Sequence, residues 1–228
     1  MSCVGIVGGL GVGATVDYYR RITAACRARG VVPDLAIVHA DVDRGQGYVR
    51  DGRLEALAEY LAGFIGRLER AGAEAAVLPA VTPHICIAEL RPRISLPLID
   101  IVEAIGGEVK RRNLRRVALF GTTFTMQGSL WGQLSGPAPQ VEIVKPRPDE
   151  IDFVGRAYQR LLDTQQGDAA ETEGLRRLAA ELQRRDGVEA VLLAGTDLAV
   201  IFDEETAGFP CIDCARVHID AIVERLAA

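Results

Sequence analysis

The sequence predicts an α/β fold made of two similar lobes, and three observations point to it. Short apolar segments rich in Val, Ile and Leu alternate with helical patterns along all 228 residues, the order expected of parallel sheets flanked by helices. Most of these segments are almost continuously apolar, as parallel strands buried on both faces are. Several segments of the first half recur in the second half, which indicates a duplicated unit.

The predicted strands are short and end in glycine, proline or polar residues. They are Val4–Val7, Leu35–His39, Ala75–Leu78, Leu98–Asp100, Val117–Phe120, Val141–Val144, Ala190–Leu193 and Cys211–Asp213.

The predicted helices show amphipathic spacing between these strands. They are Thr15–Arg29, Arg53–Ala71, His84–Leu90, Ile101–Arg112, Met126–Leu134, Ile151–Gln165, Glu171–Asp186 and Ala215–Leu226. Gly72 and Gly187 follow two of them directly, as C-terminal caps do.

The internal repeat divides the chain into two lobes. Matching residues recur at a nearly constant separation close to half the chain length: Gly8 with Gly121, Thr82 with Thr196, Pro97 with Pro210, and Asp100 with Asp213. We therefore expect one lobe from residues 1–100 plus 214–228 and another from residues 101–213. Each lobe would hold a four-stranded parallel sheet. Because ligands bind beyond the carboxyl ends of parallel strands, the site is expected in a cleft between the lobes.

Composition excludes several classes of function. The net charge of −5 with interspersed signs leaves no basic stripe for nucleic acid. No apolar run reaches the roughly 20 residues of a membrane helix, and the N-terminus enters a strand without a leader, so the cytoplasm is the expected compartment. The five cysteines form no disulfide framework. Cys211 and Cys214 form a lone C-x-x-C pair, for which small structural residues or a redox pair are the alternatives.

The first glycine-rich loop is a candidate ligand site. Gly9, Gly11 and Ala14 satisfy a relaxed G-x-G-x-x-A pattern after a strand. No acidic residue follows at the spacing of a dinucleotide fold, which disfavours a nucleotide. The alternatives are a tight turn and a small-anion site, in which N–H groups at a helix start bind a carboxylate.

Threonine hydroxyls mark three further strand ends. Thr122, Thr123 and Thr125 lie at a predicted helix start, where one of them is expected to be the N-cap. Thr82 and Thr196 end equivalent strands of the repeat. They are predicted either to bind a small polar ligand or to serve as caps.

Several charged residues are candidates for proton transfer or ligand binding. His84 follows a strand and has a side chain suited to acid–base chemistry at neutral pH; a surface or capping histidine is the alternative. Arg44 could bind a carboxylate with two hydrogen bonds or remain a solvated loop residue. His39, Asp41 and Asp43 would share one side of an extended segment, but no second ligand cluster supports a metal site. His218 is expected to be packed or exposed on the last helix.

Five collinear motifs resemble those of the cofactor-independent aspartate/glutamate racemase superfamily. They cover nearly the whole chain: "GIVGGLGVGATVDYYRRI", "RLERAGAEAAVLPAVTPH", "RRVALFGTTFTM", "EAVLLAGTDL" and "FPCIDCARVHIDAIV". The resemblance implies two pseudo-symmetric α/β lobes, isomerase activity on amino acids or their derivatives without pyridoxal phosphate or another cofactor, and a homodimer.

The resemblance also shows where this chain departs from its relatives. The family transfers protons with two cysteines, one per lobe, and their positions fall on Ala80 and Gly195. The family asparagine that binds the substrate carboxylate falls on Val81, and the glutamate after the second cysteine is the shorter Asp197. Because neither Ala nor Gly can exchange a proton, two-thiol racemisation is not expected unless Cys86 or Cys214 takes over.

Two functions from different classes remain open. The first is an enzyme acting at a carbon next to a carboxylate of a small amino or carboxylic acid, bulky or cyclic if the lost thiols enlarge the cleft. Its acid–base candidates are His84, Asp197, Asp43 and His39, of which His84 and Asp197 lie nearest the positions of the lost thiols. A decarboxylase or lyase is a variant of this function. The second is a small-carboxylate-binding protein without turnover. In both, the expected ligand-binding residues are Gly9, Arg44, Thr82, Thr122, Thr123, Thr125 and Thr196.

Overall fold

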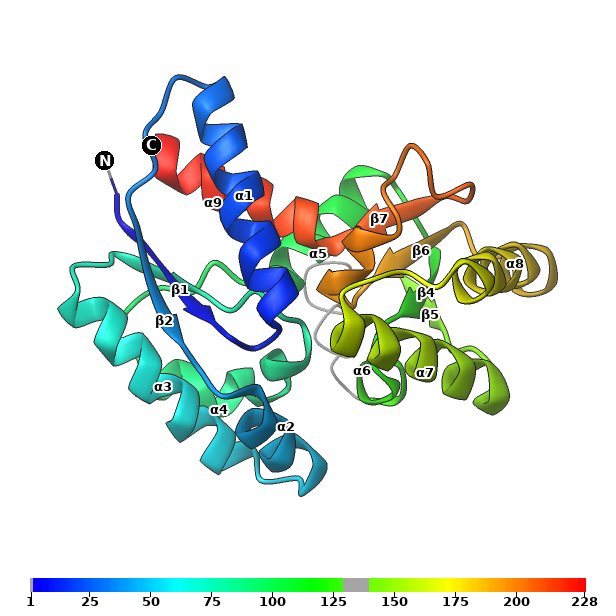
Figure 1. Cartoon of the computed structure of the whole chain (residues 1–228), viewed down its shortest axis with the longest axis horizontal. Coiled ribbons are helices and arrows are strands. Elements are labelled where there is room, and N and C mark those ends of the chain that lie inside the picture. Colours follow the sequence, from blue (N-terminus) through cyan, green and yellow to red (C-terminus); the bar gives the residue numbers. More distant parts are fainter. Residues whose placement is uncertain (1, 129–139) are drawn as a thin grey trace. The chain divides into compact units, whose positions relative to one another are not determined.

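The computed structural model describes residues 2–128 and 140–228. The chain divides into two compact units, one comprising Met1–Ile101 with His218–Ala228 and the other Val102–Val217. Each unit holds one parallel sheet with helices around it (Figure 1). The predicted α/β class with two parallel sheets is therefore confirmed.

The first unit contains a three-stranded sheet of order β2-β1-β3. Figure 1 shows α1 and α9 together on one side of this sheet and α3 on the other. Its strands are β1 (Val4–Gly8), β2 (Leu35–His39) and β3 (Ala75–Val77), and its helices are α1 (Val12–Ala28), α2 (Val42–Arg50), α3 (Leu54–Arg70), η1 (Thr82–Cys86), α4 (Ile87–Leu90) and η2 (Arg91–Arg93).

The expected fourth strand of this unit, Leu98–Asp100, is wrong as a strand. Leu98 forms a single parallel bridge with Ala76. Ala76 donates to the Pro97 carbonyl and accepts from the Ile99 amide. Pro97 would supply the preceding N–H donor of this segment and has none, so the pairing is limited to this single bridge.

The second unit contains a four-stranded sheet of order β5-β4-β6-β7. Strands β5, β4 and β6 repeat the order of β2, β1 and β3, and β7 corresponds to the segment at Leu98, which forms only a single bridge in the first sheet. Its strands are β4 (Arg116–Phe120), β5 (Glu142–Val144), β6 (Ala190–Leu193) and β7 (Cys211–Asp213), and its helices are α5 (Ile101–Arg111), α6 (Thr123–Gln127), α7 (Pro148–Thr164), α8 (Ala169–Asp186), η4 (Thr196–Val200) and α9 (Cys214–Ala227). Helix α5 begins at the last residue of the first unit, and α9 ends within that unit.

Burial differs between the strands of each sheet. The strands β1, β3, β6 and β7 are buried along their whole length, whereas the edge strands β2 and β5 are only partly covered, and Ile37 on β2 is 44% exposed. The expectation that strands are buried on both faces therefore holds for most strands and is wrong for β2 and β5.

Two helix predictions need correction. Helix α2 was not expected, because its short sequence contains two glycines and resembles a polar loop; Asp41 begins it by accepting hydrogen bonds from the Asp43 and Arg44 amides. The predicted helix Met126–Leu134 is seen only as α6, which ends at Gln127, and residues 129–134 lie outside the described part. Gly72 and Gly187 both have positive φ just past a helix, as expected of C-terminal caps.

Within residues 2–128 and 140–228, no helix combines the length and the apolar character that crossing a membrane requires.

Candidate functional site

The turn after β3 carries Ala80, Val81 and Thr82. Its backbone is held by His84, whose amide donates to the Val81 carbonyl and whose Nδ1 lies 3.0 Å from the Ala80 carbonyl oxygen. Because a carbonyl only accepts, Nδ1 carries the proton of the neutral ring. His84 thus orients the residue at which the resemblance places the first thiol.

The His84 ring is completely buried, so it is neither the surface residue nor the solvated loop residue that a turn position suggests. Its Nε2 lies 3.8 Å from Asp100 Oδ1, and Arg91 donates to Asp100 Oδ2 at 2.9 Å. Burial lowers the pKa of His84, and the Asp100 carboxylate offsets part of this effect. The ring is therefore neutral at pH 7 and sits beside a carboxylate.

His218 lies in the same part of the first unit and is fully buried. Its Nε2 donates to the Ile99 carbonyl at 2.7 Å, which leaves Nδ1 to accept from the Tyr18 hydroxyl at 3.1 Å. Burial lowers the pKa of His218 to about 4. Of the two alternatives for this histidine, packing is the one observed.

The glycine-rich loop after β1 is a tight turn. Gly9 has φ of 82°, and a Cβ there would lie 2.2 Å from the Ala40 carbonyl oxygen, so only glycine fits. Its amide donates to the Thr15 hydroxyl, which in turn donates to the Gly11 carbonyl. The close approach of turn and strand accounts for Gly9, and ligand binding by this loop stays a prediction.

Arg44 lies on α2 rather than in an extended loop. Its guanidinium stacks over Tyr60, 5.0 Å from the ring centroid, and its Nε donates to the Tyr48 hydroxyl at 3.0 Å. The side chain is exposed and is held by its contacts with Tyr48 and Tyr60. This arrangement leaves the guanidinium able to pair with a carboxylate. Because Asp41 caps α2, the extended arrangement expected of His39, Asp41 and Asp43 is wrong. No group of three potential metal ligands occurs among the described residues.

In the second unit, the turn after β4 presents the predicted threonines in two different ways. Thr122 is the N-cap of α6: its hydroxyl accepts from the Thr125 amide and lies 2.8 Å from the Thr125 hydroxyl. Thr123 instead turns toward α7, where a Cβ on Gly155 would lie 2.1 Å from its hydroxyl oxygen. The expectation that one of these threonines is a cap is therefore confirmed.

Gly195 lies just past β6, as the N-cap of η4, at the position where the resemblance places the second thiol. A Cβ on Gly195 would lie 2.3 Å from Cε2 and 2.6 Å from Cζ of Tyr158. The Tyr158 ring, which comes from α7, therefore occupies the space of the missing side chain. The expectation that loss of the second cysteine enlarges the site is wrong at Gly195.

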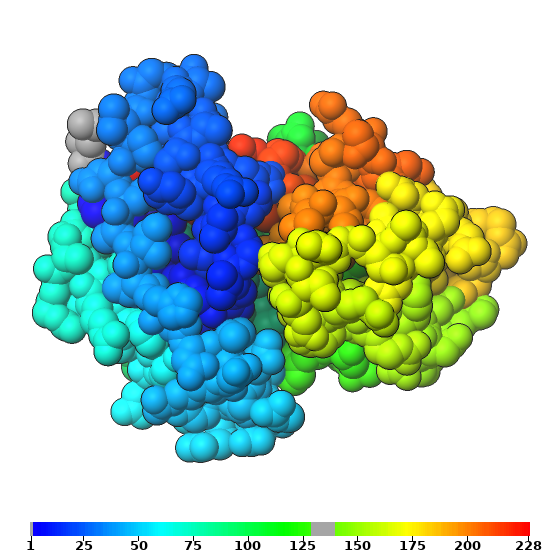
Figure 2. All heavy atoms as spheres, viewed as in Figure 1, coloured from blue at the N-terminus to red at the C-terminus, as the bar shows by residue number. Residues whose placement is uncertain are grey.

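Asp197 follows on η4 and is 3% exposed. The Tyr158 hydroxyl donates to its Oδ2 at 3.2 Å, and Gln165 Nε2 lies 3.5 Å from its Oδ1. Gln165 caps α7 in the left-handed conformation and belongs to the exposed turn that leads to α8, yellow in Figure 2. Asp197 is thus a buried carboxylate beneath a surface turn. Thr196, its neighbour, is also buried.

None of the five cysteines is positioned as a reactive thiol. All are buried and free of disulfides. Burial is the main cause that raises each pKa, to about 12 for Cys86 and Cys211 and well above its usual value for Cys214. Cys86 also donates to the Pro83 carbonyl at 3.3 Å. Thiolates at these positions are strongly disfavoured near neutral pH.

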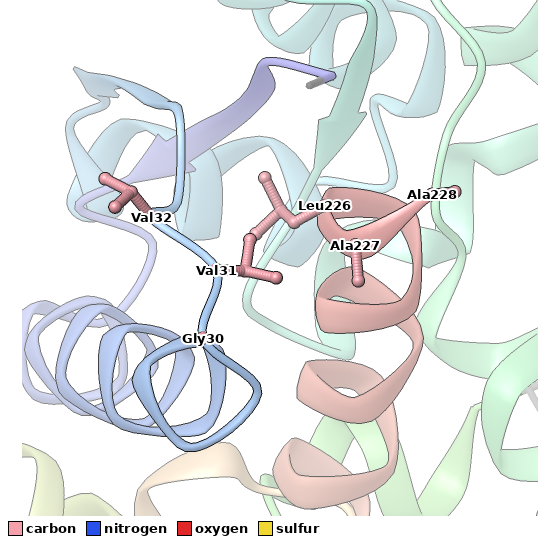
Figure 3. A pocket seen from close by; sticks show the side chains of 6 residues that line it. All are labelled: Gly30, Val31, Val32, Leu226, Ala227 and Ala228. Atoms are coloured by element: carbon pink, nitrogen blue, oxygen red, sulfur yellow. The ribbon is translucent and has the colours of Figure 1, made fainter.

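An apolar hollow of about 320 Å³ lies elsewhere in the first unit, between the end of α9 and the turn after α1 (Figure 3). It is lined by Gly30, Val31, Val32, Leu226, Ala227 and Ala228. These side chains offer no acid, base or hydrogen-bonding group, so the hollow does not supply the predicted chemistry.

Sequence reasoning missed Asp100 and Arg91 as partners of His84, and Tyr158 and Gln165 as partners of Asp197. Asp100 carried a signal, because it recurs as Asp213 in the repeat. Tyr158 carried none, since it occupies an ordinary buried position in an amphipathic helix.

Solved structures of other proteins resemble this chain over its full length. A candidate Asp/Glu racemase from Yersinia pestis matches with a TM-score of 0.86 and 23% identity, and an aspartate racemase homologue from Pyrococcus horikoshii OT3 with 0.84 and 25%, each covering 100% of both chains. The aspartate racemase of Picrophilus torridus matches with a TM-score of 0.72 and 21% identity, over 100% of this chain and 95% of its own.

The likeness extends from structure to sequence. A family model described as Asp/Glu/Hydantoin racemase matches residues 7–222, which include both units and every residue discussed above except those at the two ends of the chain. The chain belongs to the Asp/Glu/Hydantoin racemase family.

Proposed function

We propose that this protein is an enzyme that breaks or forms a bond at the carbon next to a carboxylate of a small amino or carboxylic acid, without a pair of thiols. The observation that carries the proposal is the replacement of a side chain at Gly195 by the Tyr158 ring, whose hydroxyl is bonded to buried Asp197. A polar, titratable pair thus stands where the family resemblance places a thiol.

The proposed acid–base residues are His84 and Asp197. Each lies on a 3₁₀ helix that follows a buried strand, β3 or β6, and both side chains are buried. Burial lowers the pKa of the His84 imidazole, and Asp197 is a buried carboxylate that accepts a hydrogen bond from Tyr158; acid–base residues are found in such buried, polar-paired places.

The proposed ligand-binding groups are those that can donate hydrogen bonds to a carboxylate. Arg44 presents an exposed guanidinium, and the hydroxyls of Thr82, Thr122, Thr125 and Thr196 lie at strand ends. Gly9 contributes by allowing the tight turn after β1. Thr123 has less support, because its hydroxyl packs against α7.

Isotope exchange tests the proposal directly. The enzyme is incubated in D₂O with aspartate, glutamate and a 5-substituted hydantoin in turn, and deuterium at the α-carbon is followed by mass spectrometry. Exchange of at least one compound is expected. Exchange should fall at least about a hundredfold in both Asp197→Asn and His84→Asn. Asp152→Asn, at an exposed position on α7, serves as the matched control.

The competing functions predict other results. Loss of carbon dioxide from a substituted malonate without exchange of amino acids would favour the decarboxylase variant. Calorimetric binding of a carboxylate with neither exchange nor loss of carbon dioxide would favour the binding protein. Exchange that survives in both Asp197→Asn and His84→Asn would refute the assignment of these residues.

We also propose a homodimer, as the family resemblance implies. Analytical ultracentrifugation at micromolar concentration should give a mass near twice the 24.5 kDa of one chain. A single monomeric species would refute this assembly.

A further inference from the structure

Gly195 and Tyr158 form a matched pair in the second unit. Gly195 has φ of −93° and ψ of 111°, a conformation open to any residue. Its backbone therefore does not require glycine. The requirement comes from the Tyr158 ring, since three of its carbons would lie 2.3 to 2.9 Å from a Cβ at this position.

The packing of this pair fixes the position of the Tyr158 hydroxyl. Of the ring carbons within this short distance, Cζ carries the phenol oxygen and would lie 2.6 Å from the Cβ position. The oxygen consequently lies close to the volume that a side chain on residue 195 would fill. The oxygen also donates to Asp197 Oδ2 at 3.2 Å, so it is held in place by a carboxylate.

We infer that Tyr158 is the proton-transfer residue of the second unit and works as a relay between the ligand and Asp197. The ligand C–H bond breaks, and its electron pair stays on the ligand as an enolate conjugated with the carboxylate. The Tyr158 oxygen accepts that proton while its own proton passes to Asp197 Oδ2. The reverse sequence returns a proton to carbon. The inference rests on the proposed function, in which Asp197 is the base.

The relay agrees with the electrostatics of the pair. Burial, together with the Asp197 carboxylate, raises the pKa of Tyr158 well above its usual value of 10. A free tyrosinate is therefore strongly disfavoured. A relay avoids this species, because the phenol gains one proton as it gives up another and stays neutral throughout.

A second feature favours a relay over direct attack by Asp197. The carboxylate is 3% exposed, with Tyr158 on one oxygen and Gln165 near the other. Gly195 lies just beyond the carboxyl end of β6, the edge at which parallel sheets bind ligands, and the ring of Tyr158 fills the position beside it. The phenol thus connects that position with the buried base.

The first test compares exchange rates of conservative variants. Tyr158→Phe keeps the ring that fills the space at Gly195 and removes only the oxygen. We expect kcat for deuterium exchange to fall about a hundredfold or more, with KM unchanged. Tyr19→Phe, on the exposed side of α1, is the matched control and should leave both constants unchanged.

A double variant separates a relay from a structural role. If Tyr158 and Asp197 move one proton together, Tyr158→Phe with Asp197→Asn should lose no more activity than either single variant, as residues acting as a unit do. Multiplied losses would overturn the relay while leaving Asp197 as the base. Wild-type exchange rates in Tyr158→Phe would likewise overturn the relay and leave the proposed function intact.

The second test needs no turnover. In Tyr158→Val with Gly195→Cys, the smaller side chain at 158 makes room for a thiol at 195. Iodoacetate, a carboxylate-bearing alkylating agent, should label this thiol faster than iodoacetamide does. The wild-type chain, whose five cysteines are buried, gives the background. Labelling is read by peptide mass spectrometry.

Together, the exchange and labelling tests distinguish failure of the inference from failure of the proposed function. Labelling no faster than background would show that position 195 does not border a carboxylate site and would overturn the inference. Labelling at 195 combined with no exchange by the wild-type enzyme would support Tyr158 as a ligand-bordering residue and would overturn both the relay and the proposed function. If the double variant does not fold, the exchange variants decide.

Discussion

The turns after β3 and β6 occupy equivalent places in the two repeats, yet they are built differently. After β3, a histidine four residues along the chain binds the Ala80 carbonyl and is itself packed against Asp100. After β6, the space at Gly195 is filled from outside the turn, by Tyr158 of α7. One turn is stabilised by its own sequence, and the other by a helix nearly 40 residues away in the chain.

The two units also differ in their buried titratable groups. All three histidines lie in the first unit, and two of them are fully buried. The second unit instead holds Glu108 in an ionic cluster with Arg111, Arg112 and Arg216. The difference teaches that a duplicated fold preserves strand order more strictly than the polar groups around it, so the two units should respond to acid in different pH ranges.

The largest expected effect is acid destabilisation through the first unit. His218 has a pKa of about 4 in the folded chain and 6.5 as an unperturbed histidine, so between these pH values only the unfolded chain gains the proton. Stability should therefore fall by about 3 kcal/mol as the pH drops through this range. Burial lowers the pKa of His84 as well, which adds to the effect.

Urea unfolding at a series of pH values measures this loss. In His218→Gln, which can still donate to the Ile99 carbonyl, the pH dependence should shrink. His39→Gln, at an exposed position, should leave it as in the wild type. An unchanged pH dependence in His218→Gln would contradict the assignment.

The second effect concerns the turn after β6. Gly195→Ala should destabilise the protein by about 2 kcal/mol, because the added Cβ overlaps the Tyr158 ring. In the background of Tyr158→Val most of this cost should disappear, since the two positions share one space. Chemical denaturation at pH 7 gives both values. Equal costs in the two backgrounds would mean that Tyr158 does not fill the space at Gly195.

A smaller effect is expected in the ionic cluster of the second unit. Hydrogen bonds from Arg111 and Arg112 lower the pKa of Glu108 to about 2. Glu108→Gln should cost about 1 kcal/mol at pH 7, because the arginines are partly exposed and solvent screens the pairs. The wild-type contribution should be lost as the pH falls from 4.5 toward 2, mostly below the range in which His218 titrates.

Denaturation of Glu108→Gln beside Glu142→Gln tests that value. Glu142 pairs with Arg116 at the surface, with its side chain 59% exposed, and its substitution should change stability by less than about 0.5 kcal/mol. Equal costs for the two variants would show that burial adds nothing to the Glu108 cluster.

The smallest effect is a gain. Gly107 lies at an exposed position within α5, with no heavy atom within 4 Å of an added Cβ. Gly107→Ala should therefore stabilise the protein by up to about 1 kcal/mol, because alanine loses less conformational freedom in a helix. Replacing glycine with alanine should thus raise the stability of the protein at Gly107 and lower it at Gly195. A loss of stability in Gly107→Ala would show that the free space around an added Cβ does not decide the effect of the substitution at these two positions.

Sequence reasoning reached most of the fold because the signals are local. Periodicity placed β2, β6 and β7 at their observed residues, and placed most of the longer helices within about three residues of their ends. It failed where a segment finds too few pairing partners and where a helix depends on its cap. Leu98–Asp100 looks like a strand but finds only Ala76 to pair with, and α2 depends on the Asp41 cap rather than on an apolar pattern.

The candidate site was predicted residue by residue but not contact by contact. The repeat pointed to Thr82 and Thr196, and the motif resemblance to Ala80 and Gly195. Neither could show that His84 binds the turn it follows, or that Asp197 has Tyr158 as a partner. These contacts join residues whose separation in the chain carries no pattern.

The sequence by itself determined the class of fold, the duplication, the family and the absence of thiols at Ala80 and Gly195, because each is a property of residue order. Only the tertiary structure decided what occupies the position beside Gly195. Packing fills any space that a side chain leaves, and which side chain fills it depends on how α7 lies against β6. That choice places a phenol, held by a buried carboxylate, where a thiol was expected.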